Sequence, residues 1–198
     1  GIPWRQVGPA TVMAFPSATI YPLNRADLEA VSKRTGHLLA QFATSANTGW
    51  RSAIHVLRDK DYTLQSLQRQ FRQRVLRGER ELSFRQLTWS ELVDMAAGVR
   101  RLKQAASPVG NRFDERMWQK TCNLAEADAR FMAFGCLKDS SLVGVGIFWQ
   151  HPNWMQAVEM TCHPEAFELG TANLLLYRCA HALIHQQNCE FVCFGRSN

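Results

Sequence analysis

Residues 131–146 read Phe-Met-Ala-Phe-Gly-Cys-Leu-Lys-Asp-Ser-Ser-Leu-Val-Gly-Val-Gly, and this stretch decides the fold class. Two apolar runs flank the polar residues 138–141, a pattern that predicts two strands joined by a turn. We therefore expect a β-hairpin with strands at 130–137 and 142–150.

The segments that follow the hairpin predict a strand, a helix and another strand. An apolar strand is expected at 155–162, an amphipathic helix at 171–187 and a short apolar strand at 189–194. A strand–helix–strand unit generally places its two strands parallel in one sheet. The strands at 155–162 and 189–194 should therefore lie side by side and parallel.

The segments that precede the hairpin predict helices and one strand. Apolar residues at helical spacing predict a helix that Thr63 caps and Gly78 ends, followed by a strand at 81–87. The capping-box residues 88–91 open a helix that runs to about 105. A helix at 113–127 should turn Phe113, Met117 and Leu124 toward the core. The fold class is α/β, with a mixed β-sheet flanked by helices.

Residues 1–60 carry weaker signals. We expect an extended arm with a strand at 11–15, a short helix around Leu28 and Val31, and a strand at 52–57. The length of 198 residues suits a single domain with a sizeable core. The predicted organisation is an arm with loops at 1–60, packed on a core at 61–198.

Composition limits the classes of partner and compartment. The net charge of +6 favours anionic partners, either nucleic acid or a phosphate-bearing cofactor. No apolar run approaches the roughly 18–20 residues of a membrane-spanning helix, so no membrane partner is expected. The sequence shows no charged-then-apolar leader, and its six cysteines match no disulfide framework. We expect a reduced, cytoplasmic protein.

Two stretches carry a resemblance to a known family. The order of elements and the hairpin at 131–146 resemble the core of the GNAT superfamily, and residues 173–177 with 191–197 resemble its FemAB-like branch. The resemblance implies an N-acyltransferase that moves an acyl group from acyl-CoA, or an aminoacyl group from tRNA, to a small-molecule or peptide amine. It also departs from the family, because the loop before the helix at 171 holds one glycine, and relatives continue beyond the turn at 195–197.

The resemblance and the residue types together nominate a set of site residues. A helix N-terminus suits a phosphate, so the start of the helix would hold the cofactor. A carboxylate or imidazole near the end of strand 155–162 would act as general base, a tyrosine would protonate the leaving group, and residues after the last strand would bind substrate. The candidates are, for the cofactor, Gly170, Thr171, Ala172 and Asn173; for catalysis, Glu159, His163 and Tyr177; for substrate, Arg196 and Ser197.

Three alternatives remain beside the enzyme. A zinc site built from His181, His185, Cys189 and Cys193 is disfavoured, because two cysteines four residues apart on a strand stand roughly 13 Å apart; we expect no metal. The runner-up function is a non-catalytic nucleic-acid- or partner-binding module on the same GNAT-like scaffold. The arginines between 69 and 80 suit either nucleic-acid binding by such a module or a solvated helix face. The strand at 189–194 is an edge that would pair with a partner chain or a second copy.

Overall fold

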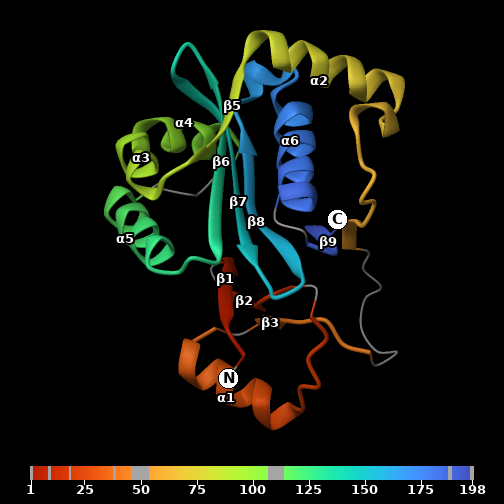
Figure 1. The fold of residues 1–198 in the computed structure, drawn as a ribbon. Helices are drawn as coiled ribbons and strands as arrows, with labels where there is room; N and C mark the ends of the chain where they lie inside the picture. The colour runs from red at the N-terminus through yellow and green to blue at the C-terminus, as the bar shows by residue number, and fades with distance from the viewer. Residues whose placement is uncertain are drawn as a thin grey trace. The chain divides into compact units, whose positions relative to one another are not determined.

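The computed structural model describes residues 2–8, 10–17, 19–37, 39–45, 54–106, 114–186 and 189–196 (Figure 1). The chain divides into two compact units, Gly1–His55 with Cys193–Asn198, and Val56–Val192. The smaller unit holds β1 (Trp4–Gly8), β2 (Thr11–Ala14), α1 (Arg25–Thr35) and β3 (Leu39–Gln41). β1 and β2 are antiparallel, and β3 runs parallel to β2. The expected strand and short helix are present, but this segment forms a sheet of its own rather than an extended arm.

The main sheet contains six strands in the order β4-β9-β8-β7-β6-β5. Their bounds are β4 (Ile54–Leu57), β5 (Ser83–Leu87), β6 (Phe131–Lys138), β7 (Ser141–Gln150), β8 (Trp154–Cys162) and β9 (Phe191–Arg196). Neighbours from β5 to β8 pair antiparallel. The predicted hairpin is confirmed as β6–β7, and Asp139 (φ 47°) and Ser140 (φ 67°) have the positive φ angles that tight hairpin turns require. The α/β class with a mixed sheet is confirmed.

β8 and β9 are neighbours, as predicted. Their first residues lie side by side, because the Glu190 N–H donates to the Asn153 carbonyl at 2.7 Å. The rings of Trp154 and Phe191 stack there, with centroids 5.2 Å apart. Strands that begin together favour a parallel pair, although the orientation itself stays a prediction.

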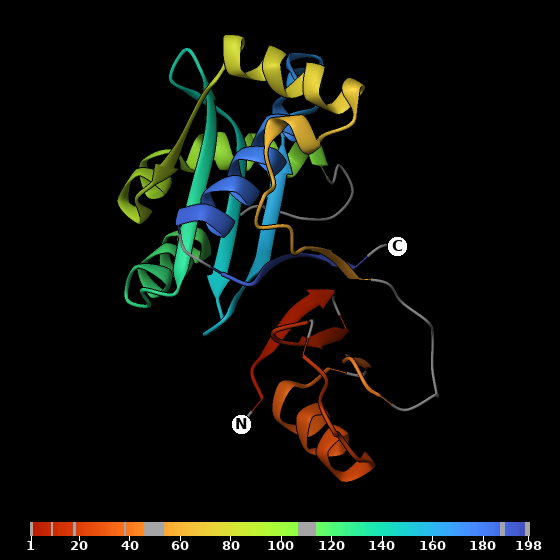
Figure 2. The same ribbon diagram turned by 45° about the vertical axis from the view of Figure 1, so that its right-hand side comes forward.

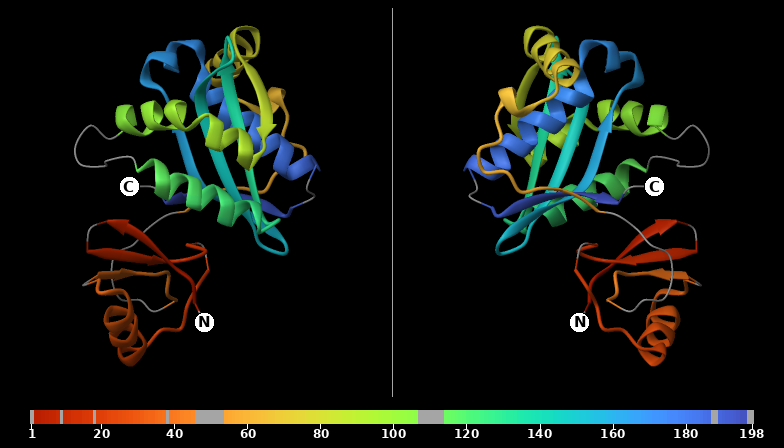
Figure 3. Two further views of the ribbon diagram at one scale, coloured as in Figure 1. Left: turned by 90° about the vertical axis from the view of Figure 1, so that its left-hand side faces the viewer. Right: turned by 90° about the vertical axis from the view of Figure 1, so that its right-hand side faces the viewer.

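One face of the sheet is covered by α3 (Trp89–Asp94), α4 (Ala96–Ala106) and α5 (Glu115–Glu126) (Figure 3). The single helix expected at 88–105 is divided into two helices, α3 and α4, at Met95. The predicted buried face of α5 is wrong by one residue, because Met117 is 57% exposed and Leu124 is 65% exposed. Trp118 fixes the buried side of α5, because its indole N–H donates to the Leu92 carbonyl at 3.0 Å inside the core.

The other face carries α6 (Thr171–Gln186), and α2 (Arg69–Glu81) lies across the start of α6 (Figure 2). Two short 3-10 helices, η1 (Leu64–Ser66) and η2 (Pro164–Leu169), precede α2 and α6. The predicted bounds of α2 are wrong at both ends, because Thr63 precedes η1 and Gly78 lies inside the helix. A Cβ on Gly78 would stand 2.9 Å from the Leu174 Cβ, so glycine permits this helix crossing rather than ending the helix.

A similar order of elements occurs twice in the chain. In the smaller unit, an antiparallel pair (β1–β2) is followed by α1 and by β3 beside β2. In the larger sheet, the antiparallel pair β7–β8 is followed by α6 and by β9 beside β8.

Among the described residues, no helix has the length and apolar character needed to cross a membrane.

Candidate active site

A shift of register in β8 positions Glu159. Ile147 of β7 faces Glu159, whereas the next residue, Phe148, faces Ala157, so β8 holds an extra residue at this point. Such a bulge re-aims the side chains beside it. Ile147 belongs to the core cluster under α3–α5, and cross-strand partners share a face, so Glu159 lies on that face, half-buried. The hydroxyl of Thr161 lies 3.4 Å from its carboxylate.

His163 stands at the end of β8 as the second candidate base. Its backbone N–H donates to the Val143 carbonyl at 2.9 Å, which fixes the turn. Its ring Nδ1 lies 3.8 Å from a carboxylate oxygen of Glu165, and a quarter of its side chain is exposed. His163 lies four positions after Glu159, a distance of about 13 Å along an extended chain. The two groups therefore cannot take the same proton, and they are alternatives.

Tyr177 does not join Glu159. Its buried ring lies 5.6 Å from that of Tyr62 and 5.8 Å from that of His181, on α6. Burial, followed by the charge of Glu79, raises the pKa of Tyr177. α6 packs on the face opposite Glu159, since a Cβ on Gly146, the residue before Ile147, would lie 3.4 Å from the Cys179 sulfur. The structure thus separates two of the predicted catalytic residues.

The predicted cofactor residues form the first turn of α6, which is partly closed. Thr171 is fully buried, and its hydroxyl donates to the Ala166 carbonyl at 2.6 Å. Gly170 has a φ of 79°, and a Cβ there would overlap the Arg74 carbonyl oxygen of α2. Ala172 is exposed and Asn173 is half-buried, so solvent reaches only this side of the turn.

The predicted substrate residues lie at the end of β9. Gly195 has a φ of 97°, which favours glycine at this position. Arg196 is the last residue of the strand. Ser197 lies outside the described residues. The roles of Arg196 and Ser197 stay predictions.

The histidines and cysteines of the disfavoured zinc site have other contacts. His185 Nε2 lies 3.0 Å from the Tyr62 carbonyl oxygen, and its ring lies tilted against that of His181, with the ring centroids 4.3 Å apart. The Cys189 thiol contacts the Leu183 carbonyl oxygen at 3.2 Å. Across the part of the chain that the structure describes, no three His, Cys, Asp or Glu side chains are placed to hold a metal ion.

Three thiols lie between the sheet and α6, close to the strand that carries Glu159. Burial, followed by the neighbouring Cys162, raises the pKa of Cys136 to about 12. Burial also raises the pKa of Cys162 to about 12 and that of Cys179 well above its ordinary value. A nucleophilic cysteine needs a lowered pKa, so these thiols do not suit covalent catalysis.

We expect these thiols to resist modification in the native protein. A pKa of about 12 instead of 9.0 lowers the thiolate fraction at pH 8 by about 10³-fold, and the group charges only as the pH approaches 12. Labelling with a thiol-reactive disulfide at pH 8, mapped by peptide mass spectrometry, should leave Cys136, Cys162 and Cys179 unmodified. In denaturant all six cysteines should react. Rapid native labelling of Cys162 would contradict this assignment.

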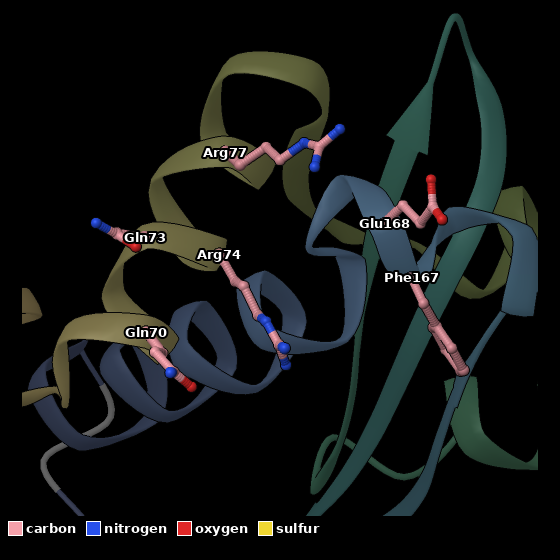
Figure 4. Close-up of a pocket in the computed structure, with 6 residues that line it drawn as sticks. All are labelled: Gln70, Gln73, Arg74, Arg77, Phe167 and Glu168. Atoms are coloured by element: carbon pink, nitrogen blue, oxygen red, sulfur yellow. The ribbon is translucent and has the colours of Figure 1, made fainter.

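A surface hollow of about 790 Å³ lies between α2 and η2 (Figure 4). Its lining residues are Gln70, Gln73, Arg74, Arg77, Phe167 and Glu168. In the sequence the arginines of α2 form a basic run, which does not by itself separate those on one face of the helix. The spacing of 70, 73, 74 and 77 is the signal that identifies this face, but its partner in η2 is distant in sequence.

No family model matches this sequence, and no curated protein matches it either. Solved structures do match. The C-terminal domain (DUF2156) of a putative lysylphosphatidylglycerol synthetase from Agrobacterium fabrum is 12% identical, with a TM-score of 0.59 over 99% of this chain and 67% of that one. FemX is 8% identical, with a TM-score of 0.57 over 72% of this chain and 52% of its own. A GNAT family acetyltransferase from Staphylococcus aureus is 13% identical, with a TM-score of 0.47 over 55% and 82%.

Proposed function

Because the chain has a GNAT-like fold of the FemAB type, we propose that it is an N-acyltransferase that forms an amide on an amine acceptor. The observation that carries the proposal is Glu159, a half-buried carboxylate that the bulge of β8 places in the middle of the sheet. Transfer to an amine requires a base at a fixed position, and such a group typically contributes about 10²–10⁴-fold to the rate.

We propose an aminoacyl group carried by tRNA as the donor, in preference to acyl-CoA. A pyrophosphate at the start of α6 needs exposed backbone N–H groups, but Thr171 is fully buried and Gly170 packs against the backbone of α2. The protein matched over 99% of this chain carries a name that refers to a lysyl product. The net charge of +6 suits an anionic donor of this kind, and we propose that the reaction takes place in the cytoplasm, where aminoacyl-tRNA is found.

The proposed step balances as an ordinary aminolysis. The amine nitrogen attacks the ester carbonyl carbon, a C–N bond forms, and the C–O bond to the ribose breaks. The proton lost by the nitrogen goes to the Glu159 carboxylate, directly or through one water. The ribose oxygen then leaves as a hydroxyl, because it takes a proton from the protonated Glu159 or from a water in exchange with it. Positioning the two reactants supplies much of the remaining acceleration.

The test offers the full chain both donors. Aminoacyl-tRNAs labelled in the amino acid, or an acyl-CoA mixture, are incubated with amine-bearing acceptors, and products are identified by mass spectrometry. We expect amide products from the tRNA arm that disappear after ribonuclease treatment. Products from acyl-CoA alone would overturn the choice of donor.

Transfer from neither donor would overturn the proposal and favour the non-catalytic nucleic-acid-binding alternative. That alternative predicts salt-dependent RNA binding that weakens when Arg69, Arg72 and Arg77 of α2 are replaced together. A steeper salt dependence in the wild-type protein than in this variant would support it.

A further inference from the structure

The hollow between α2 and η2 has one basic wall. Residues 70, 73, 74 and 77 fall on one face of α2, and the guanidinium groups of Arg74 and Arg77 extend on the side that faces η2 (Figure 4). Both arginines are exposed, and neither has an ion-pair or hydrogen-bond partner among the residues that the structure describes. Two unpaired guanidiniums one helical turn apart suit the oxygens of a phosphate group.

The opposite wall is aromatic and acidic. Phe167 leaves 54% of its surface in solvent, although the neighbouring Ala166 is buried. Glu168 is exposed and forms no ion pair with either arginine, within the described ranges. An unpaired nucleic-acid base can stack on a phenyl ring, and a carboxylate can accept a hydrogen bond from the exocyclic amino group of such a base.

The two walls are held at a fixed separation. The backbone of α2 touches Gly170, and the α2 residue Gly78 packs against Leu174 of α6. α2 therefore cannot move relative to η2 without breaking the helix crossing. The hollow is preformed, and its volume of about 790 Å³ lies within the usual range of small-ligand pockets.

We propose that this hollow binds one nucleotide whose base carries an amino group. The phosphate lies against Arg74 and Arg77, the base stacks on Phe167, and Glu168 accepts from the exocyclic amino group. Cytosine and adenine satisfy this arrangement, whereas uracil presents a carbonyl oxygen to the carboxylate. This binding goes beyond acyl transfer and does not depend on it, because the hollow is formed by α2 and η2 and not by the strand that carries Glu159.

The experiment measures binding of CMP, UMP and inorganic phosphate to the full chain by calorimetric titration. We expect CMP to bind about tenfold more tightly than UMP, the worth of one base-edge hydrogen bond. Arg74→Ala and Arg77→Ala should each weaken CMP binding about tenfold or more. Glu168→Gln should abolish the preference, because an amide offers both an oxygen that accepts from the cytosine amino group and an N–H that donates to the uracil oxygen.

Arg80→Ala is the matched control, since Arg80 is exposed on the same helix but does not line the hollow. If this variant lost as much CMP affinity as the Arg74 and Arg77 variants, the loss would reflect the general positive charge of the helix, and the proposal would be overturned. Equal binding of CMP, UMP and phosphate would also overturn it, because it would leave only an anion site. Free nucleotide and an RNA end are distinguished by a trinucleotide that ends in cytidine or adenosine: tighter binding than CMP identifies an RNA end, and equal binding identifies the free nucleotide.

Discussion

Replacing Glu159 by glutamine is expected to lower the rate of acyl transfer by about 10²–10⁴-fold, the usual contribution of a positioned base. The change keeps the shape of the side chain and removes its capacity to take a proton. Because the base acts mainly in the transition state, the affinity for donor and acceptor should change little. Steady-state kinetics with saturating donor would measure both quantities.

Three further variants test which group is the base. His163→Ala should produce a loss of this size only if the imidazole is the base, since about 13 Å of strand separates the two groups. Glu165→Gln is the matched control, because this carboxylate lies near His163 but its side chain is 90% exposed. Tyr177→Phe should leave the rate nearly unchanged, since Tyr177 packs on the α6 side of the sheet. A full rate in Glu159→Gln would remove Glu159 from the mechanism.

Replacing Gly170 by alanine is expected to destabilise the larger unit by about 2–6 kcal/mol. A left-handed backbone costs a non-glycine residue roughly 1–3 kcal/mol, and forcing atoms into a packed site typically adds about 1–3 kcal/mol. Gly170 meets both conditions, because its φ is 79° and a Cβ there would overlap the Arg74 carbonyl oxygen. Urea unfolding followed by circular dichroism would measure the loss.

Gly36→Ala is the control for the backbone contribution alone. Gly36 caps α1 with a φ of 70°, and a Cβ there would meet nothing within 4 Å. Its replacement should cost about 1 kcal/mol, the difference between glycine and alanine in that conformation. If the two alanine variants lost equal stability, the close packing of α2 on the start of α6 would be refuted. Hydrogen exchange in α2 should accelerate only in the Gly170 variant.

Local patterns predicted the elements of the larger unit well, because those patterns depend on neighbours in sequence. The hairpin of β6 and β7 follows from two apolar runs around a polar turn. α3 begins at the predicted capping box, where Thr88 and Glu91 satisfy each other's backbone N–H groups. The strand–helix–strand order placed β9 beside β8. Misses occurred where a contact distant in sequence overrides the local signal, as at Trp118, whose bond to Leu92 turns α5 by one residue.

Local sequence patterns are enough to predict the α/β class, the order of strands and helices in the core, and the position of Glu159 in the strand before α6. Which of the nominated residues share a site depends on tertiary packing. The fold placed Glu159 and Tyr177 on opposite faces of the sheet, and it closed part of the predicted phosphate site by packing α2 on Gly170. It also brought Arg74 and Phe167, 93 residues apart (167 − 74), to one hollow. Local spacing cannot report such pairs, because they arise from the packing of whole helices across the chain.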